Sequence, residues 1–502
     1  MKRIINRESL VSHGNLEGRK ILADIMEAGM MAADPYNNTM KLVRIEKDLL
    51  IFEGEAFEAE GDPRTGPTVF DLKNDIDRIF IFGIGKGIQR VTKALEDLLG
   101  DRLSGGYVLG KHGDEIIMER VGVTLGGHPT PDEYCVEGCR KIVEALKYAK
   151  LTERDLVITA MGNGIGSLCT YPVDEVPLSD VTEMVRLMQI EYGMPTSDLC
   201  FIRNNIDRLK GGKLSRMMRP AKLIHLLGIP PKIVNKPFFD MSGYDALTKK
   251  NLWLHTLCDD TSPKEALDII RVWDTKKKCP TTVQKYLKKP DPEYLTVKPD
   301  EYESWNCRVF GVMPAVYGTF PSAMSRAREW GYKPYILTDW LQTEAASAGA
   351  VIAQVALSSE KGITPFKPPC AIFSGGEVIV TCGENPGIGG RNQEVVVAGS
   401  IVITGSKRIV MSAVDTDGTD GPGGEFHPEA TKQGITVLSG GIVDGYTNQQ
   451  AEKRKVNLEE ALRTHSTSAV LWELNCGIAS TQNISVTDLQ CTLVMDHDGL
   501  AE

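Results

Sequence analysis

The chain has 502 residues, of which 42% are hydrophobic and 25% are charged, and this composition excludes a largely disordered protein. A chain of this length is expected to form two domains, each with its own core. The formal net charge of −10 disfavours binding to nucleic acid polymers and to anionic membranes, so a small anionic ligand would need a local group of cations.

Export and membrane signals are missing from the sequence pattern. The start Met-Lys-Arg-Ile-Ile-Asn-Arg turns polar early, and no stretch approaches the roughly 18 apolar residues that a membrane span requires. The eleven cysteines show neither CxxC pairs nor zinc-ligand spacing, and Cys135 and Cys139 are interpreted as buried thiols of one helix. We therefore expect a cytoplasmic protein with reduced cysteines and no membrane partner.

In the first half, short apolar runs end in glycine turns and alternate with helical patterns. We expect strands over residues 76–82, 106–109, 121–125 and 156–160, and helices over 91–99, 137–150 and 178–192. This alternation predicts a mainly parallel sheet with helices on its faces.

A change of composition over residues 276–302, with three consecutive lysines and four prolines, indicates a domain boundary. We therefore expect one domain over 1–285 and a second α/β domain over 300–502. In the second, the pattern predicts strands over 307–312, 334–338, 371–373, 378–382, 408–414 and 491–495, and helices over 322–330 and 343–357.

The first candidate site is the turn Gly83-Ile84-Gly85-Lys86-Gly87, which follows a strand and precedes a helix. Backbone N–H groups at such a turn suit a phosphate or carboxylate, and Lys86 would add a cation. A dinucleotide fingerprint would need glycine at position 88, where the chain has Ile88. Residues 105–111 approach a Walker A pattern, but His112 stands where that pattern needs Ser or Thr. A structural turn without a ligand explains the glycines about as well.

Other candidate residues in the first half also lie in or beside turns. His128 stands between Gly127 and Pro129, where it could face a ligand, and a further glycine turn spans residues 162–167. Arg203 and Lys210 add cations, although their residue types and spacing alone favour solvated surface charge for both.

In the second half, glycines precede an Arg-Asn-Gln-Glu run, with Arg391 at the expected start of a helix. A guanidinium there offers a planar fork for a carboxylate or phosphate. The loop Asp415-Thr-Asp417-Gly-Thr-Asp420-Gly clusters three carboxylates, which could bind Mg²⁺ or supply a general base. An Asp/Gly-rich turn without a ligand is the alternative.

Taken in order, these motifs resemble those of the glycerate 2-kinase family, whose C-terminal half is called the MOFRL domain. The resemblance runs from about Gly18 to Met495. It implies an α/β fold with two domains: an N-terminal Rossmann-like domain with a mainly parallel sheet, and a C-terminal α/β domain containing the MOFRL region over about 370–497. It also implies an active site in the cleft between the domains.

The resemblance further implies a kinase that transfers the γ-phosphoryl group of ATP, with Mg²⁺, to the 2-hydroxyl of D-glycerate. Its partners would be a small anionic hydroxy acid and a nucleotide. By matching motif positions, Lys86, Arg391 and Asp417 would be catalytic, and Asp417 and Asp420 would bind the metal. The residues that would bind substrate or nucleotide are Gly83, Gly85, His128, Asn163, Gly164, Arg203, Lys210, Gly389, Gly390, Asn392 and Glu394.

The first half departs from the family pattern at several turns. Asp207 stands where the family has Ser before Lys-Gly-Gly, and Asn204 replaces a Lys after Arg203. Segments 228–235 and 482–485 also differ. We therefore keep two alternatives: a sugar-acid-binding homologue that is non-catalytic or has another substrate, and an NAD(P)-dependent reductase of hydroxypyruvate-like acids. The oligomeric state is left open, with a homodimer as one option.

Overall fold

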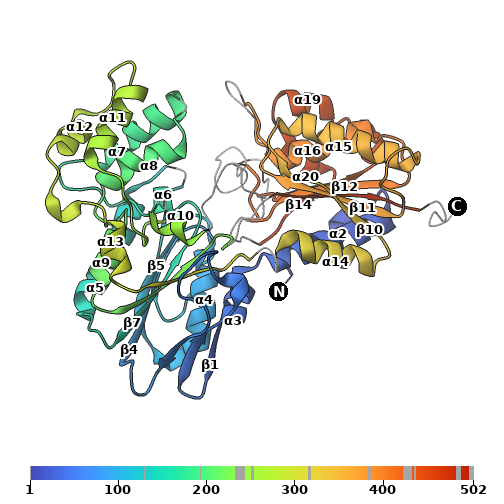
Figure 1. Cartoon of the computed structure of the whole chain (residues 1–502). Coiled ribbons are helices and arrows are strands. Elements are labelled where there is room, and N and C mark those ends of the chain that lie inside the picture. The colour runs from blue at the N-terminus through green and yellow to red at the C-terminus, as the bar shows by residue number, and fades with distance from the viewer. Residues whose placement is uncertain are drawn as a thin grey trace. The chain divides into compact units, whose positions relative to one another are not determined.

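The computed structural model describes residues 2–128, 130–192, 194–231, 243–249, 254–314, 318–382, 387–421, 432, 434, 437–481 and 488–496. The chain divides into two compact units (Figure 1). One unit spans Pro35–Ala315 and is called the parallel-sheet unit; the other joins Met1–Asp34 to Val316–Glu502 and is called the mixed-sheet unit. Within the described ranges, every helix is too short or too polar to cross a membrane.

The parallel-sheet unit is built on a six-stranded sheet with the order β6-β5-β4-β7-β8-β9, and every neighbouring pair is parallel. Its strands are β4 (Arg78–Ile84), β5 (Leu103–Lys111), β6 (Gly122–Gly126), β7 (Asp155–Met161), β8 (Lys222–Leu227) and β9 (Arg308–Gly311). The chain first forms β4 and then adds β5 and β6 on one side of it. It then crosses back to form β7 on the other side of β4, and adds β8 and β9 beyond β7. This is the Rossmann strand order, so the predicted mainly parallel sheet is confirmed.

Helices cover this sheet, and a small antiparallel sheet adjoins it. The helices are α3 (Pro35–Leu42), α4 (Ile88–Leu99), α5 (Glu133–Ala149), α6 (Ile165–Leu168), α7 (Leu178–Val185), α8 (Thr196–Asn205), α9 (Lys213–Met218), α10 (Tyr244–Lys249), α11 (Pro263–Trp273), α12 (Thr281–Lys288) and α13 (Pro299–Glu303). The small sheet contains β1 (Val43–Glu46), β2 (Leu49–Phe52) and β3 (Thr68–Asp71). The single helix expected over 178–192 is α7 followed by a π-helical stretch, Arg186–Glu191.

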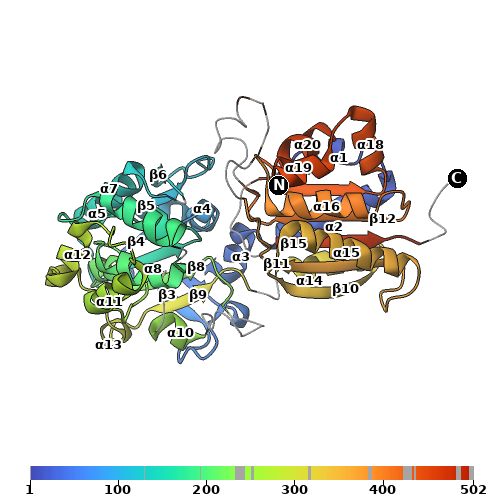
Figure 2. The ribbon, with the colours of Figure 1, turned by 90° about the horizontal axis from the view of Figure 1, so that it is seen from above.

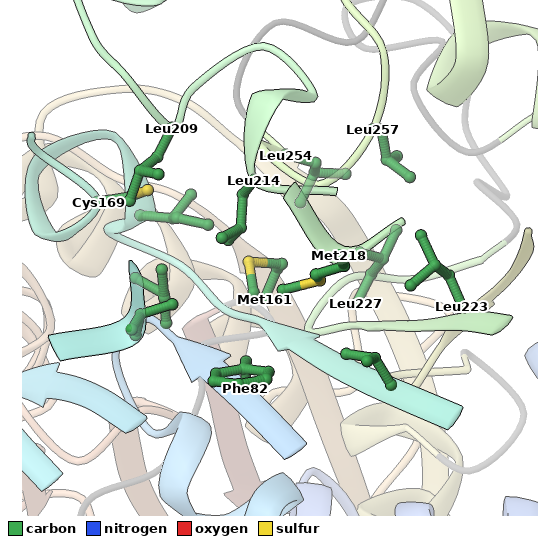
Figure 3. Close-up of a cluster of buried hydrophobic side chains, with 14 of the residues drawn as sticks. Phe82, Met161, Cys169, Leu209, Leu214, Met218, Leu223, Leu227, Leu254 and Leu257 are labelled. Atoms are coloured by element: carbon green, nitrogen blue, oxygen red, sulfur yellow. The ribbon is translucent and has the colours of Figure 1, made fainter. Parts of the chain in front are cut away.

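The main core of this unit lies on one face of the sheet. Phe82 of β4 and Met161 of β7 pack with Leu214 and Met218 of α9 (Figure 3). Each large apolar side chain buried in this way contributes about 1.5–3 kcal/mol to stability. A separate apolar cluster joins α7, α8, α11 and α12. The strands that carry the glycine turns, β4 and β7, are therefore anchored by the main core.

The expected domain ranges 1–285 and 300–502 need correction. β9, which we expected to open the second domain, pairs with β8 and completes the first sheet. The charged, proline-rich stretch before it contains α12 and α13 and belongs to the same unit. Local composition indicates helices and turns, but it does not indicate which strands pair when they are far apart in the sequence. For this reason the boundary expected over residues 276–302 is wrong.

The mixed-sheet unit has a six-stranded sheet with the order β10-β11-β15-β12-β13-β14. The strands are β10 (Lys333–Leu341), β11 (Cys370–Gly376), β15 (Asp488–Val494), β12 (Ile409–Asp415), β13 (Gly440–Asp444) and β14 (Gly477–Ile478). β10 and β11 are parallel and the other neighbours are antiparallel. The carboxyl ends of β11 and β12 therefore lie at the same sheet edge as the amino end of β15.

Helices cover both faces of the mixed sheet. They are α1 (Arg7–Leu10), α2 (Leu16–Ala32), α14 (Thr319–Glu329), α15 (Ala345–Glu360), α16 (Arg391–Val402), α18 (Thr447–Arg454), α19 (Leu458–Arg463) and α20 (Thr467–Glu473). The pair α2 and α14 covers one face, and α15 and α16 cover the other (Figure 1). Figure 2 shows α18, α19 and α20 gathered beside α16. The strand expected over 378–382 is wrong, because Ile379 forms a single isolated bridge with Glu344.

A buried ion pair ties the N-terminal segment to the mixed sheet. Nε of Arg19 on α2 lies 2.5 Å from Oδ2 of Asp444 at the end of β13, and both side chains are fully buried. Arg19 also donates to the carbonyl oxygen of Leu10 and to Oγ1 of Thr447. Removing one partner of such a pair costs about 3–5 kcal/mol, because the other charge stays buried. The first 34 residues are therefore part of this unit.

Candidate active site

The predicted residues of the first half gather where the strand order of the parallel sheet reverses, between β4 and β7. Ligands of open parallel sheets bind beyond the carboxyl ends of the strands at this reversal. Lys86 follows β4, His128 follows β6, and Asn163 and Gly164 follow β7. We call these four residues, together with Arg203 of α8, the switch-point cluster.

Backbone hydrogen bonds join the turns after β4 and β7. The N–H of Lys86 donates to the carbonyl oxygen of Asn163 over 2.8 Å, and the N–H of Gly162 donates to that of Ile84 over 2.8 Å. The N–H of Gly85 donates to the carbonyl oxygen of Leu109 over 3.0 Å. The glycine turns therefore extend the sheet by one step beyond the strand ends and hold Lys86 and Asn163 side by side.

Two glycines make these contacts possible. Gly85 has a φ of 142°, and a Cβ there would lie 2.5 Å from the Cα of Gly162. Gly164 has a φ of 72°, and a Cβ there would lie 2.7 Å from Cδ2 of His128 and 3.1 Å from Cγ of Lys86. The side chains of His128 and Lys86 therefore both lie against Gly164, and a larger residue would force them away.

Arg203 approaches the same turn from α8. Its Nη1 lies 3.2 Å from the point that a Cβ on Gly166 would occupy, and its side chain is 7% exposed. Among the described residues no carboxylate pairs with this guanidinium, and burial lowers its pKa. A buried cation without a counter-ion is costly unless an anion joins it, so Arg203 is suited to bind an anionic ligand.

Lys210 lies close to Arg203 in sequence but is already paired. Its ammonium group donates to Oδ2 of Asp207 and to Oγ1 of Thr170, each over 3.1 Å, and to the carbonyl oxygen of Cys169. Lys210 and Asp207 are both buried. Asp207, one of the departures from the family pattern, therefore balances the charge of Lys210, and the ligand-binding role of this lysine stays a prediction.

Gly83 has a packing role inside β4. A Cβ on Gly83 would lie 2.8 Å from Cγ2 of Thr92, so the absence of a side chain at this position lets α4 pack closely on β4. This position supports the turn that carries Lys86.

In the mixed-sheet unit, the predicted residues gather at the sheet edge formed by the ends of β11, β12 and β15. Arg391, the first residue of α16, is held by three carboxylates. Its Nε lies 3.1 and 3.0 Å from Oδ1 and Oδ2 of Asp488, and its Nη2 lies 2.9 Å from Oδ1 of Asp488. Nη2 also lies 2.9 Å from Oδ2 of Asp415, and Nη1 lies 3.2 Å from Oε1 of Glu377.

The electrostatics of this edge reflect burial and crowding. Burial and repulsion from Asp417 raise the pKa of Asp415 well above its usual range. Burial also raises the pKa of Asp488, against the opposing effect of Arg391. Burial alone would lower the pKa of Arg391, but the charges of Asp488 and Asp415 raise it. The guanidinium is therefore permanently charged, and its charge is largely balanced by its own neighbours.

Asp420 caps the helix that begins with Arg391. Its Oδ1 accepts the backbone N–H of Asn392 over 3.1 Å, and its Oδ2 accepts that of Gln393 over 2.9 Å. A carboxylate at a helix N-terminus satisfies N–H groups that lack partners within the helix. Burial raises the pKa of Asp420 to about 6. Both carboxylate oxygens are thus engaged by the backbone.

The pair Asp417 and Asp420 fits Mg²⁺ poorly in this arrangement. Both oxygens of Asp420 accept N–H groups of α16, and Oδ1 of Asp417 accepts the N–H of Thr419 over 2.7 Å, so three of the four carboxylate oxygens of the pair already bind the backbone. Over the described part of the chain, no group of three or more His, Cys, Asp or Glu side chains is placed to hold a metal ion. The metal-binding role of these two residues stays a prediction.

The other predicted residues of this edge are engaged in packing. A Cβ on Gly389 would lie 2.5 Å from Oγ1 of Thr467, and one on Gly390 would lie 2.3 Å from the carbonyl oxygen of Asp420. Asn392 is buried and donates to Oδ1 of Asp488 over 3.0 Å. Glu394 is buried against His465, with 2.7 Å between Oε1 and Nδ1. These residues shape the start of α16.

Sequence reasoning missed Asp488, the residue with the most contacts to Arg391. It is the first residue of β15, in which apolar residues alternate with Gln490 and Thr492, so a carboxylate at the start of an alternating strand pattern was the available signal. Two altered segments, 228–235 and 482–485, lie partly or wholly outside the described residues, and Pro129, which follows His128, lies outside them as well.

Comparison with known proteins agrees with this description. Residues 21–228 match a family model described as a domain of unknown function (DUF4147), and residues 370–496 match the MOFRL family. A glycerate 2-kinase of Pyrococcus horikoshii is 27% identical over 90% of this chain and 93% of its own. A D-glycerate 2-kinase of Thermotoga maritima is 27% identical over 75% and 80% of the two chains.

Two further likenesses bear on the alternatives. A protein of Agrobacterium vitis, provisionally named a hydroxypyruvate reductase, is 28% identical over 68% of this chain and 83% of its own. The crystal structure of a glycerate kinase from Thermotoga maritima matches with a TM-score of 0.69 and 23% identity, over 95% of this chain and all of that chain. The last comparison shows a shared fold.

The chain has two α/β units. The parallel-sheet unit has a Rossmann-type sheet and carries the switch-point cluster, and the mixed-sheet unit contains the MOFRL match and Arg391. Together they define a two-unit α/β enzyme fold. The two family models follow each other in the order that the motifs predicted. The chain belongs to the glycerate 2-kinase family.

Proposed function

We propose that this protein is an ATP-dependent kinase that phosphorylates a hydroxyl group of a small sugar acid, with D-glycerate converted to 2-phosphoglycerate as the default reaction. Membership of the family makes it a phosphotransferase with an alcohol group as acceptor. The observation that carries the proposal is the gathering of Lys86, His128, Asn163, Gly164 and Arg203 at the reversal of the parallel sheet.

The chemistry of the cluster suits phosphoryl transfer, which depends mostly on positioning and on stabilising negative charge. Lys86 supplies a cation beside a turn whose backbone is fixed by the Asn163 hydrogen bond. Arg203, buried without a carboxylate partner among the described residues, would hold the substrate carboxylate or a phosphoryl oxygen. His128, packed against Gly164, would orient the acid between them.

Arg391 would act from the mixed-sheet unit, through the part of its guanidinium that Asp488 and Asp415 leave open. Since Asp420 caps α16, the Mg²⁺ of this proposal would be carried mainly by the phosphates of ATP, as is common for this ion. The interdomain position of the site and a cytoplasmic location stay predictions. The proposed partners are one hydroxy acid and one nucleotide.

A reductase of hydroxypyruvate-like acids is the second candidate, because the strand order is that of dinucleotide-binding folds. Against it, Ile88 stands where the fingerprint needs glycine, and the N–H groups of Gly85 and Lys86 are used within the sheet. A non-catalytic binder would keep the cluster and lose turnover.

The test is an ADP-release assay with ATP and Mg²⁺ across D-glycerate, L-glycerate, tetronates and pentonates, with NADH oxidation by hydroxypyruvate measured in parallel. Lys86→Met and Arg391→Ala should lower kcat/KM severely and leave only a residual rate, whereas Lys73→Met, at an exposed lysine of the same unit as Lys86, should leave kcat/KM unchanged. Turnover on one acid would identify the substrate. Silence of the folded protein across all acids, or NADH oxidation instead, would refute the kinase.

A further inference from the structure

Asp488 is placed to control Arg391. Its side chain is 0% exposed, and its two oxygens face Nε and Nη2 of the guanidinium at 2.9 to 3.1 Å. This is a fork-on-fork contact, which fixes the plane of the guanidinium as well as its position. Asp415 touches a single nitrogen, Nη2, and Glu377 touches Nη1. Asp488 therefore makes the contact that determines orientation.

The position of Asp488 is itself fixed by the sheet. In the register of β15 it lies opposite Gly376 of β11 and Asp415 of β12, so backbone pairing holds it on both sides. Nδ2 of Asn392 donates to its Oδ1 over 3.0 Å, which ties the carboxylate to the first turn of α16. The carboxylate therefore has little freedom to turn away from Arg391.

The remaining edge of the guanidinium is the one that could receive a ligand. With Nε and Nη2 held by Asp488 and Asp415, the described residues leave Nη1 with one contact, Glu377, whose side chain is 71% exposed. An exposed ion pair of this kind contributes roughly 0–1 kcal/mol, so an anion can replace it. Nη1 is thus the outward-facing donor of Arg391.

We propose that Asp488 is a positioning residue of the phosphotransferase, which fixes the guanidinium of Arg391 so that Nη1 presents to the anionic substrate or to the transferring phosphoryl group. This inference rests on the proposed function. It differs from a stabilising role, because Asp488 acts on catalysis through the orientation of one nitrogen.

The same unit offers a matched control. Asp444 and Arg19 form a second buried Asp–Arg pair, with both side chains fully buried. Asp444 lies opposite Val410 at the start of β12, whereas Asp488 lies opposite Asp415 at its end. Asp444→Asn and Asp488→Asn therefore remove the same charge from the same kind of environment at opposite edges of one sheet.

The experiment compares steady-state kinetics and melting temperatures of the full-length wild type, Asp488→Asn, Asp488→Glu and Asp444→Asn. A misplacement of about 1 Å can cost about 100-fold in rate, so we expect kcat/KM to fall about 100-fold in Asp488→Asn. We expect Asp488→Glu to recover at least about tenfold of that loss, because it keeps the charge. Asp444→Asn should lower the melting temperature and leave kcat/KM within about threefold of the wild type. Equal kinetic losses in Asp488→Asn and Asp444→Asn would refute positioning.

A double variant tests whether Asp488 acts through Arg391. If it does, Arg391→Met with Asp488→Asn should have the same kcat/KM as Arg391→Met alone, because coupled residues are not additive. Independent, multiplying losses would overturn the inference.

A readout without activity separates the inference from the proposed function. The Nε–H signal of Arg391 in protein labelled with ¹⁵N-arginine, assigned by its loss in Arg391→Lys, should shift in Asp488→Asn and stay unchanged in Asp444→Asn. If the wild type turns over no acid while this shift occurs, the kinase proposal fails but Asp488 is still shown to hold Arg391. An unchanged signal in Asp488→Asn overturns the inference whatever the activity.

Discussion

The backbone N–H of Lys86 donates a hydrogen bond of 2.8 Å to the carbonyl oxygen of Asn163, and this bond joins the turns that follow β4 and β7. The two turns come this close because Gly85 and Gly162 have no side chains between them. The position of Lys86, the proposed catalytic lysine, therefore depends on Gly85, which has no side chain and takes no part in the chemistry.

We expect Gly85→Ala to cause a large loss of kcat/KM and only a moderate loss of stability. An added Cβ would lie 2.5 Å from the Cα of Gly162, so the turns must separate and the Lys86–Asn163 bond must break. Overpacking of this kind costs about 1–3 kcal/mol, whereas displacement of Lys86 should lower kcat/KM by about 100-fold or more. Kinetics and urea unfolding of the variant measure both effects.

Gly100→Ala is the matched control. Gly100 also has a positive φ, 53°, but nothing lies within 4 Å of its Cβ position. The control should lose some stability from backbone strain and keep its activity. A Gly85→Ala variant with near-normal kcat/KM would show that the contact between the turns is dispensable.

Much of the parallel sheet could be predicted from the sequence. The apolar runs that became β4, β5, β6 and β7 each end in glycine or charge, and parallel strands place these ends at one edge. What could not be predicted is long-range pairing. β9 follows a charged, proline-rich stretch yet completes the first sheet, and Arg19 finds its partner Asp444 more than 400 residues away.

The site was predictable to the extent that its residues lie in local motifs. Lys86, His128 and Asn163 each stand in a glycine turn after a strand, and the structure brings them together. The buried ion pair of Lys210 and Asp207 was not predictable, because the sequence does not show whether a lysine is buried against a carboxylate or available to bind a ligand. Asp488 acquires its contact with Arg391 only through the pairing of β15 between β11 and β12.

We expect Arg203→Met to remove ligand-dependent stabilisation without loss of stability in the free protein. The buried guanidinium lacks a carboxylate partner among the described residues, so its replacement by an apolar side chain should leave the melting temperature unchanged or raise it. A bound acid at about 100 times its Kd stabilises the wild type by about 2.7 kcal/mol, and the variant should lose this gain. Thermal unfolding with and without D-glycerate measures both.

Lys210→Met should behave in the opposite way. Lys210 is a buried cation of the same unit, but its loss leaves the carboxylate of Asp207 buried and unpaired, at a cost of about 3–5 kcal/mol. If Arg203→Met destabilised the free protein as much as Lys210→Met does, Arg203 would be a structural cation and not a ligand-binding one.

Asp420 should prove to be a helix cap. We expect Asp420→Ala to lower the free energy of unfolding by about 1–2 kcal/mol, since the N–H groups of Asn392 and Gln393 lose their acceptor. Asp420→Asn keeps one acceptor oxygen and should lose less. The loss of a metal ligand would raise the Mg²⁺ concentration that the protein needs, so the activity of the wild type and of Asp420→Asn is measured against Mg²⁺ concentration. An unchanged half-maximal concentration in Asp420→Asn supports the cap, and a large increase would identify Asp420 as a magnesium ligand.

The acid sensitivity of the parallel-sheet unit should depend in part on His225 of β8. This side chain is fully buried, its Nδ1 lies 2.7 Å from Oγ1 of Thr159, and burial lowers its pKa from 6.5 to about 3. Between these two values the unfolded chain binds a proton that the folded chain does not. The free energy of unfolding therefore falls as the pH falls below about 6.5.

From pH 7 to pH 5 this one histidine should cost about 2 kcal/mol, since one pKa unit corresponds to about 1.4 kcal/mol. His225→Leu removes the group, so its unfolding free energy should fall less over the same interval, even if the variant is weaker at pH 8, where the histidine is neutral in both states. Urea unfolding of both proteins at pH 8, 7, 6 and 5 gives the comparison. Parallel curves would mean that the pKa of His225 is the same in the folded and unfolded chains, so that the buried imidazole takes up a proton below about pH 6.5 and needs a counter-charge that the described residues do not supply.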